Sequence, residues 1–344
     1  ILIKIYVMKK VILLSLIFLI CACDSDQNKA GRFFIKGNES LNKGDYNEAV
    51  RLYSEAIAKN DKYTEAYNNR GVAYYRDRKF IEAINDYSTI LLQVNPDFTD
   101  ARRNRVNAYL DSKRYDKALV DLDVLEQLFP DSAYVDFNRG LVYHEMKDFT
   151  KSIESFNVAL KKDNGNPEIL INAANGYFML DNFAQAEQLL NQAEMIDATE
   201  PNIYNTQALI ETSKGNYDKA LALVEEALEI DPSNPYFFNN RGFIYLMLGD
   251  LVKAGPDIRR AIIGASENAW GYRNRGILLH LQENYEGAIR NFERAEKLEG
   301  KVPMMLDYWV ASLKALGRAD EACEKMKEAP NEVKPETKAG LPCK

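Results

Sequence analysis

Histidine and tryptophan are the rarest residue types in this chain of 344 residues, with two of each. The two histidines, His144 and His280, lie far apart in the sequence, so we expect neither a shared metal site nor a histidine-based catalytic pair. The chain also lacks a glycine-rich phosphate loop, a CxxC pair and a GxSxG motif. These absences predict a protein that has no catalytic residues, binds no metal and needs no cofactor.

Basic side chains are outnumbered by acidic ones. Lys and Arg total 44 against 51 Asp and Glu, which gives a net charge of −7. Loss of residues 1–22 would remove Lys4, Lys9 and Lys10 but no acid, so a processed chain would be more acidic still. Nucleic acids and anionic membrane surfaces attract basic proteins, so neither is expected to be the main partner.

Cysteine is also scarce, with four residues in the whole chain. Cys21 and Cys23 stand close together near the N-terminus, whereas Cys323 and Cys343 lie near the C-terminus. A disulfide between Cys323 and Cys343 is conceivable, but two cysteines do not make a disulfide framework.

The sequence does contain an internal repeat. Alanine recurs every 34 residues, with one step of 35 between Ala83 and Ala118 and one serine, Ser152, in the series. When this alanine is numbered position 20, nine repeats follow one another from residue 30 to residue 329. Their ranges are 30–63, 64–98, 99–132, 133–166, 167–200, 201–234, 235–268, 269–302 and 303–329.

Each repeat has the pattern of two helices. Small residues at positions 8, 20 and 27 let two antiparallel helices approach closely, while larger apolar residues at positions 4, 11, 17 and 24 fill the space between them. Proline at position 32, or at position 1 of the next repeat, ends the second helix because proline cannot continue it. The sequence therefore predicts an all-α chain that forms one continuous solenoid.

This period and residue pattern resemble the tetratricopeptide repeat, a helix–turn–helix unit of 34 residues. The resemblance covers residues 30–329 and implies an α-solenoid that winds into a right-handed superhelix of about nine repeats. In such proteins positions 2, 5, 6, 9, 12 and 13 of the first helix face a concave groove. The resemblance therefore implies a protein that binds partner proteins or peptides in this groove.

The first 22 residues have the pattern of a signal peptide. The chain begins with Ile1, and Met8 is the better start, because two lysines and an apolar run over residues 11–20 follow it. The run is too short to span a membrane. It ends at Cys23 in a sequence that resembles the bacterial lipobox, which implies that Cys23 carries a lipid. The alternatives are an ordinary secretory signal and an apolar anchor.

Two short segments flank the repeats. Residues 23–29 are expected to form the lipidated N-terminus and a short linker, which would keep the solenoid close to a membrane surface. Residues 330–344 are rich in Pro, Lys and Glu, and this composition predicts a flexible tail.

Arginine occupies position 7 in five repeats, and a hydrogen-bond acceptor stands sixteen residues later in each. The pairs are Arg70 with Asp86, Arg105 with Asp121, Arg139 with Ser155, Arg241 with Asp257, and Arg275 with Asn291. The four repeats without this arginine hold leucine or lysine at position 23. We expect each arginine to bond its own second helix; the alternative is a ladder of arginines that grips an acidic ligand.

One subgroup of tetratricopeptide proteins holds a C-terminal carboxylate with basic and asparagine side chains from three repeats. Arg103, Asn107 and Asn138 match the first three positions of this clamp. Glu168 and Asn172 stand where the remaining cations should be, so only half of the clamp is present. Asparagine also recurs at position 6, where its amide could bond the backbone of an extended peptide.

The groove positions change from asparagine and arginine in the early repeats to aromatic residues in the later ones. The candidate partner-binding residues are Asn68, Arg76, Arg103, Asn107 and Asn138, followed by Tyr236, Asn239, Phe243, Trp270, Arg273 and His280. The alternative is that the aromatic rings pack against neighbouring first helices and are inaccessible.

Together these features predict a lipid-anchored scaffold of the bacterial cell envelope, on its periplasmic or surface side. Its partners would be envelope proteins or peptide segments, bound in the groove while the lipid confines the complex to the membrane. The alternative is a glycan-binding protein, or an accessory subunit of an envelope enzyme, that uses the aromatic half of the groove.

Overall fold

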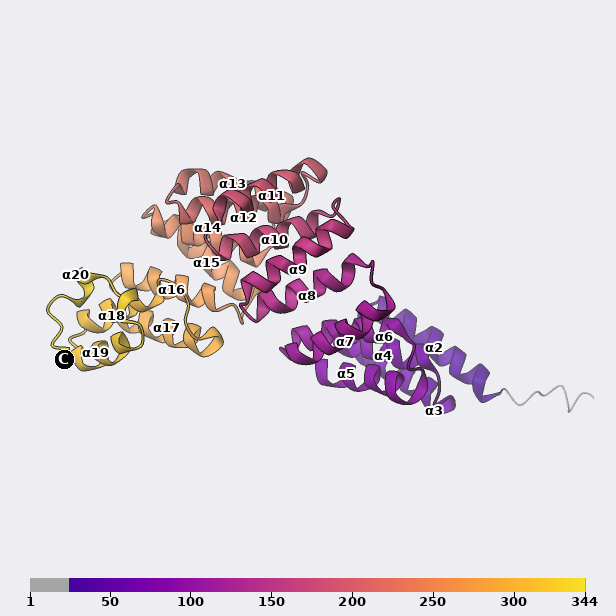
Figure 1. Cartoon of the computed structure of the whole chain (residues 1–344). Helices are drawn as coiled ribbons and strands as arrows, with labels where there is room; N and C mark the ends of the chain where they lie inside the picture. The colour runs from indigo at the N-terminus through magenta and orange to yellow at the C-terminus, as the bar shows by residue number, and fades with distance from the viewer. Residues whose placement is uncertain (1–24, 344) are drawn as a thin grey trace, which may run out of the picture. The chain divides into compact units, whose positions relative to one another are not determined.

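The computed structural model describes residues 25–343, and every regular element in this range is a helix. None of these helices is long and apolar enough to cross a membrane. The chain divides into two compact units, residues 1–162 and 163–344, and each is described by itself (Figure 1).

Unit 1 contains the first four repeats as consecutive pairs of helices. In chain order the helices are α2 (Asp26–Asn42), α3 (Tyr46–Lys59), α4 (Thr64–Arg76), α5 (Phe80–Thr89), the π-helix η1 (Ile90–Val94), α6 (Thr99–Asp111), α7 (Tyr115–Leu128), α8 (Ala133–Glu145) and α9 (Phe149–Lys162). The two helices of each repeat pack on each other, and the first helices α2, α4 and α6 also contact one another in turn.

Unit 2 contains the other five repeats. Its helices are α10 (Pro167–Met179), α11 (Phe183–Ile196), α12 (Pro201–Ser213), α13 (Tyr217–Ile230), α14 (Pro235–Met247), α15 (Leu251–Gly264), α16 (Ala269–Leu281), α17 (Tyr285–Glu299), α18 (Met305–Ala315) and α19 (Ala319–Lys327), followed by the 3₁₀ turn η2 (Pro330–Glu332) and α20 (Pro335–Lys338). The first helices α10, α12, α14, α16 and α18 contact one another in succession. Both units thus have the helix-pair packing of a tetratricopeptide solenoid.

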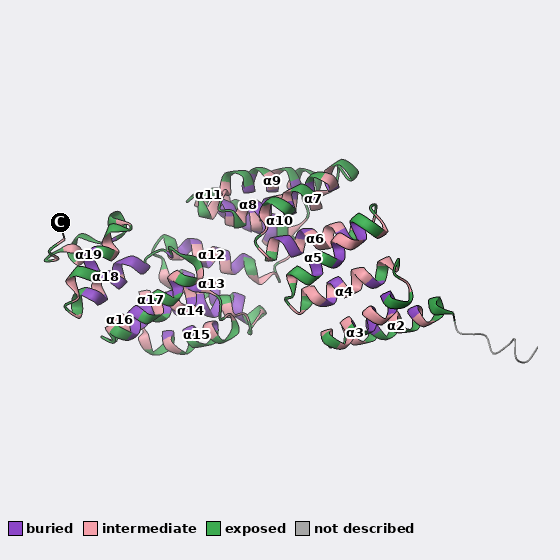
Figure 2. Ribbon diagram, turned by 90° about the horizontal axis from the view of Figure 1, so that it is seen from below, coloured by how far each residue is buried: buried purple, intermediate pink, exposed green. Residues whose placement is uncertain are grey.

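The small residues of the repeat lie where the two helices of a pair touch. All nine residues at position 20, eight alanines and Ser152, are completely buried. Glycine at position 8 lies under the side chain at position 24 of the same repeat, which is an aromatic ring in four of the five cases and Ile258 in the fifth. A Cβ atom on Gly276 would come within 2.3 Å of the Phe292 ring, so only glycine allows this approach. In Figure 2 buried residues alternate with exposed ones along each helix, as expected of helices with one buried face.

The single repeat of 35 residues has a local explanation. Its extra residue is taken up at the end of α5, where the chain makes the π-helical turn η1 and the amide of Asn95 donates to the carbonyl of Ile90, five residues back. A π-turn inserts one residue into a helix without changing what precedes or follows it. The next first helix, α6, consequently begins at Thr99, position 1 of the third repeat.

The first helix begins earlier than the sequence predicts. Residues 23–29 are expected to be a linker, but α2 begins at Asp26. The hydroxyl of Ser25 caps the helix by accepting a hydrogen bond from the amide of Asn28, and Asp26 lies in the first turn, where an acid is favourable. Cys23 and the signal segment lie outside the described residues.

The C-terminal segment is also more ordered than its composition predicts. Residues 330–343, called the strap below, fold back over the last repeat instead of forming a flexible tail. Val333 is 2 % exposed and belongs to the apolar core of unit 2, and the amide of Lys334 donates to Asp307 of α18 at 3.0 Å. The strap supplies part of the cover that a further repeat would otherwise give to α18.

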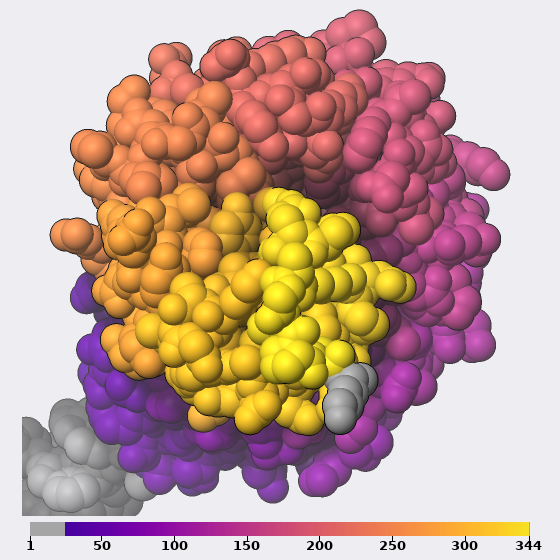
Figure 3. All heavy atoms as spheres, turned by 90° about the vertical axis from the view of Figure 1, so that its left-hand side faces the viewer, coloured from indigo at the N-terminus to yellow at the C-terminus, as the bar shows by residue number. Residues whose placement is uncertain are grey.

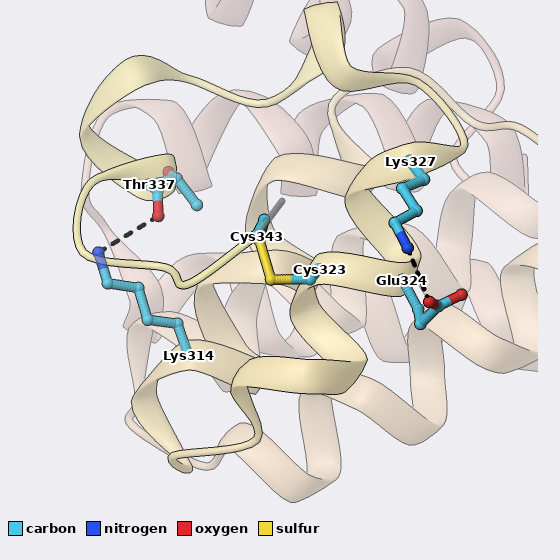
Figure 4. Close-up of a disulfide and its surroundings, with 6 residues drawn as sticks. All are labelled: Lys314, Cys323, Glu324, Lys327, Thr337 and Cys343. Carbon is cyan, nitrogen blue, oxygen red and sulfur yellow. Dashed lines mark hydrogen bonds and ion pairs between the residues drawn. A yellow bond between two sulfur atoms is a disulfide. The ribbon is translucent and has the colours of Figure 1, made fainter.

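Two further contacts hold the strap (Figure 4). A disulfide joins Cys343 to Cys323 of α19. The sequence allowed this pairing but did not require it. The ammonium group of Lys314 donates to the carbonyls of Glu336 and Thr337 at 3.4 and 3.2 Å, and to that of Ala339. In Figure 3 the strap belongs to the yellow surface, which it shares with the last helices of the chain.

Candidate functional site

A chain of hydrogen bonds connects the first helices of unit 2 to one another. It runs along repeat positions 5 and 6, which the resemblance assigns to the groove. Its members, called the amide chain below, are Asn205, Asn240, Asn239, Asn274 and Arg273, and it ends on the backbone carbonyl of Pro303. From α12 to α16 the three amide-to-amide steps measure 2.8, 3.2 and 2.9 Å, and the two steps through the guanidinium measure 2.9 and 3.1 Å.

Unit 1 repeats the arrangement with asparagine alone. The amide of Asn104 on α6 donates to Asn68 on α4 at 3.0 Å, Asn68 donates to Asn69, and Asn69 donates to Asn38 on α2 at 2.9 Å. The Tyr53 hydroxyl also donates to the Asn38 oxygen. Each unit therefore has a directional series of hydrogen bonds that ties one repeat to the next, in which each bond can polarise its neighbour.

The amide chain gives a structural role to residues that the sequence suggested for partner binding. Asn68, Asn239 and Arg273 all bond neighbouring repeats. Asn239 is buried, and its carboxamide oxygen and backbone carbonyl both accept from Asn274. The recurrence of asparagine at positions 5 and 6, in register from repeat to repeat, was the available signal, and sequence reasoning assigned it to a ligand instead.

The half clamp on α6 and α8 is not assembled as a hydrogen-bonded group. Asn138 is buried and donates to the carbonyl of Tyr134 in its own helix. The guanidinium of Arg103 lies 5.0 Å from the centre of the Tyr134 ring and 5.4 Å from that of Phe129. Within residues 25–343 no hydrogen bond joins Arg103, Asn107 and Asn138. Asn107 is half-buried and Arg76 is exposed, so these two side chains are open to solvent.

Most of the aromatic candidates in unit 2 are packed. Phe243 and Trp270 are half-buried, and the guanidinium carbon of Arg273 lies between them, 4.4 and 4.7 Å from their ring centres. Tyr236 differs, because its side chain is 56 % exposed on the first turn of α14. Of the aromatic candidates at the groove positions, Tyr236 is thus the ring most open to a partner.

His280 takes part in a packed cluster at the C-terminal end of α16. Its Nδ1 lies 2.8 Å from Ser312 Oγ, and its ring meets Tyr285 and Tyr308 edge to face, each with centres 5.4 Å apart. The Ser312 hydroxyl donates to the carbonyl of Tyr308, so Nδ1 must carry the hydrogen and donate to Ser312. Burial lowers the pKa of His280, with a smaller opposing effect from Asp307.

The expected pairing of positions 7 and 23 is confirmed in three of five repeats. Arg70, Arg105 and Arg241 each donate two hydrogen bonds to the aspartate sixteen residues later, at 2.6–3.0 Å. Burial raises the pKa of Asp86 although the Arg70 guanidinium opposes this shift, so desolvation offsets much of the attraction. These ion pairs hold the two helices of a repeat together.

The pairing is wrong for the two repeats whose position 23 is not acidic. Ser155 donates to the carbonyl of Lys151, and Arg139 instead bonds Asp123 and Glu126 of the preceding second helix, each at 2.9 Å. Asn291 donates to the carbonyl of Gly287, while Arg275 is exposed. A neutral side chain at position 23 can bond its own helix, whereas a carboxylate cannot donate and so recruits the arginine.

The described residues contain no group of three or more His, Cys, Asp or Glu side chains that could hold a metal ion. An open cavity of about 610 Å³ lies outside the groove, between α17, α18 and α19. Its lining is mainly charged and includes Arg318, Glu321 and Lys325, which are engaged in ion pairs.

Comparison with known proteins gives the same fold. Residues 37–77 and 208–249 match a family model described as TPR repeat, and residues 143–210 match one described as Tetratricopeptide repeat. The chain therefore contains tetratricopeptide repeats. Over 90 % of its length it also resembles a chain in the crystal structure of the APC/C hetero-tetramer Cut9-Hcn1, with a TM-score of 0.64, 14 % identity and 74 % of that chain covered. This likeness shows the fold.

Curated relatives match only short stretches. Hsp70-Hsp90 organizing protein 1 of Glycine max is 33 % identical over 84 residues, which is 24 % of this chain and 14 % of that protein. Sperm-associated antigen 1 of Homo sapiens is 33 % identical over 95 residues, 28 % of this chain and 10 % of that protein. The chain thus spans about a tenth to a seventh of the length of these two relatives.

Proposed function

We propose that this protein is a scaffold that binds partner proteins or peptide segments on the first-helix surface of its repeats, without catalysis. The observation that carries the proposal is the amide chain, which holds successive first helices at fixed spacing and so presents a preorganised surface. Preorganisation lowers the ordering cost of binding. The name of the Glycine max relative, an organizing protein for Hsp70 and Hsp90, supports a protein-binding role for repeats of this kind.

Tyr236 is the residue on which this proposal can be tested most directly. It is an exposed aromatic ring beside the amide chain, and such rings bury a large area at low entropic cost when a partner binds. Its side chain is 56 % exposed, so its truncation should disturb the packing of α14 little. Its backbone amide donates the N-cap hydrogen bond to the side-chain oxygen of Asn234, and this backbone contact survives truncation of the Tyr236 side chain.

The test is cross-linked capture of partners from the native envelope with wild type, Tyr236→Ala and Val252→Ala. Val252 lies in the same repeat on α15 and is 85 % exposed, so it serves as a matched control on the second helix. We expect Tyr236→Ala to reduce capture by roughly tenfold, as hot-spot truncations do, and Val252→Ala to leave it unchanged. Equal capture by all three proteins would show that Tyr236 is not part of the binding surface.

We further propose that the chain is anchored through a lipid on Cys23 and works in the bacterial cell envelope. The apolar run that ends at Cys23 supports this, and so does the disulfide between Cys323 and Cys343, because disulfides persist mainly in oxidising compartments. The Cys23→Ala variant is expected to leave the membrane fraction. If it stays there after a high-salt wash, the lipid anchor is the wrong explanation.

The glycan-binding alternative gains less support. Sugar rings stack on open aromatic faces, and the faces of Phe243 and Trp270 are turned toward Arg273 instead. Tyr236 alone would offer one such face.

A further inference from the structure

Arg273 is a buried cation whose charge has no acidic partner within residues 25–343. Its exposed fraction is 3 %, and the acceptors of its hydrogen bonds, Asn274 Oδ1 and the Pro303 carbonyl, are both neutral. The arginines at position 7 contrast with it, since Arg70, Arg105 and Arg241 each face an aspartate. An uncompensated buried charge is costly, so a cation kept in this state needs an explanation.

The residues around Arg273 fix the position of its guanidinium group, but none that bonds it within the described residues is acidic. The guanidinium carbon lies over the rings of both Phe243 and Trp270. Nε and one Nη donate to the neutral acceptors, so the other Nη has no bonded partner in the described range. Burial lowers the pKa of Arg273 to about 9, with a small opposing effect from Tyr308. The side chain is therefore preorganised to accept a negative group at the remaining nitrogen.

Arg103 shows the same features at position 5 in unit 1. Its guanidinium lies between the rings of Phe129 and Tyr134, and its buried Nε has no hydrogen-bond partner. The two arginines at position 5 are thus stacked on aromatic rings and lack acids, whereas paired arginines occur at position 7. This contrast within one chain argues that the missing counter-charge at position 5 belongs to another molecule.

We propose that Arg273 binds the carboxylate of an aspartate or glutamate side chain within an extended segment of the partner protein. The proposal rests on the scaffold function above and names the chemistry of its ligand. An internal acidic side chain fits better than a chain end. A terminal carboxylate clamp needs free asparagine amides, and the amides of Asn239 and Asn274 are already used by the amide chain. One Nη nitrogen of Arg273 is left, which suits a single carboxylate.

The experiment uses three probes and the full chain. The first is an acetylated, amidated pentapeptide with one central glutamate, the second is its glutamine version, and the third is a pentapeptide without acidic side chains but with a free C-terminus. Binding is followed by NMR at the Arg273 Nε–Hε signal, which is assigned by its loss in Arg273→Lys. We expect the glutamate peptide to shift this signal saturably and to bind at least tenfold more tightly than the glutamine peptide.

Two variants provide matched controls because they make the same chemical change. Arg273→Lys keeps the positive charge but loses the planar guanidinium group and its contacts with the two rings. It should weaken the binding of the glutamate peptide at least tenfold. Arg241→Lys makes the change at an arginine that already has its aspartate, and it should alter binding less than twofold. The comparison of the three peptides uses the wild-type protein, so it remains valid even if a variant folds poorly.

The outcomes separate this inference from the scaffold function. Equal affinity for the glutamate and glutamine peptides, or binding of the free C-terminus alone, would overturn the role of Arg273 as a receptor for acidic side chains. Failure of all three peptides to move the Arg273 signal would overturn it as well. In each case partner capture through Tyr236 is an independent result, so the scaffold function can stand while the inference falls.

Discussion

The pairing of Arg241 with Asp257 can be tested by a double-mutant cycle. Arg241 donates Nε to Oδ2 at 2.6 Å and Nη2 to Oδ1 at 3.0 Å, joining α14 to α15. The Asp257 side chain is 6 % exposed, whereas that of Arg241 is 21 % exposed. Loss of the arginine would therefore leave a buried carboxylate without a partner, whereas loss of the carboxylate would leave an arginine that can reach water.

The expected magnitudes follow from this asymmetry. Removing one partner of a buried ion pair costs about 3–5 kcal/mol, and partial exposure of Arg241 reduces the expected loss for Arg241→Met to about 2–4 kcal/mol. Asp257→Leu should cost about 1–2 kcal/mol, because the guanidinium can turn toward water. The double variant resembles the fifth repeat, where Leu189 at position 23 is buried, and should lose less than about 1.5 kcal/mol. The coupling energy is then about 1.5 kcal/mol or more.

Urea unfolding of the four proteins, followed by circular dichroism, measures these values, provided that the m-values agree. Arg275→Met is the matched control, because Arg275 occupies position 7 of the next repeat but is exposed. Its cost should stay within about 0.5 kcal/mol. Two results would refute the reasoning: a double variant whose loss equals the sum of the single losses, or an Arg275→Met variant as unstable as Arg241→Met.

Three other predictions follow from the packing. Cys343→Ser should lower the free energy of unfolding by about 3 kcal/mol, because the disulfide closes a loop across a sequence separation of 20, and unchanged hydrogen exchange in the strap would contradict the anchoring described above. Gly276→Ala should cost about 1–3 kcal/mol in urea unfolding, since its Cβ would meet the Phe292 ring. Gly31→Ala, which meets nothing within 4 Å, should instead stabilise α2 by up to about 1 kcal/mol. Burial lowers the pKa of His280 in the folded chain, so protonation favours unfolding, and stability should fall as pH drops below about 6.5, the value in the unfolded chain. His280→Gln should reduce this fall between pH 7.5 and 5.5, and an identical fall in both proteins would show that other groups cause it.

Much of the fold could be predicted because a solenoid repeats its contacts as it repeats its sequence. Each repeat packs mainly on its neighbours, so a residue type needed at one contact recurs at a fixed spacing. Position 20 is buried in all nine repeats, and glycine at position 8 lies under the large side chain at position 24. The spacing of Arg241 and Asp257 likewise predicted their ion pair, because both lie within one repeat.

Local composition was a poorer guide at the two ends of the chain. Residues 330–343 have the composition of a flexible tail, yet Val333 belongs to the apolar core of unit 2, Lys334 bonds Asp307 of α18, and Cys343 is joined to Cys323 of α19. Such anchors depend on which surface the last repeat leaves uncovered, and composition carries no information about that surface. The early start of α2 is different, because Ser25 is a helix-capping residue that the sequence displays.

The sequence by itself determined the repeat and the pairing of helices, because these follow from periodic residue sizes and from contacts within a repeat, whereas the positions that face the groove were implied by the family resemblance. Only the tertiary structure decided which groove residues are free. An asparagine at position 5 or 6 has the same sequence context whether its amide meets a ligand or the next repeat, and the spacing between first helices settles this for Asn68 and Asn239. The burial of Arg273 likewise requires Phe243, Trp270 and Pro303 from three successive repeats to converge, which no single repeat encodes.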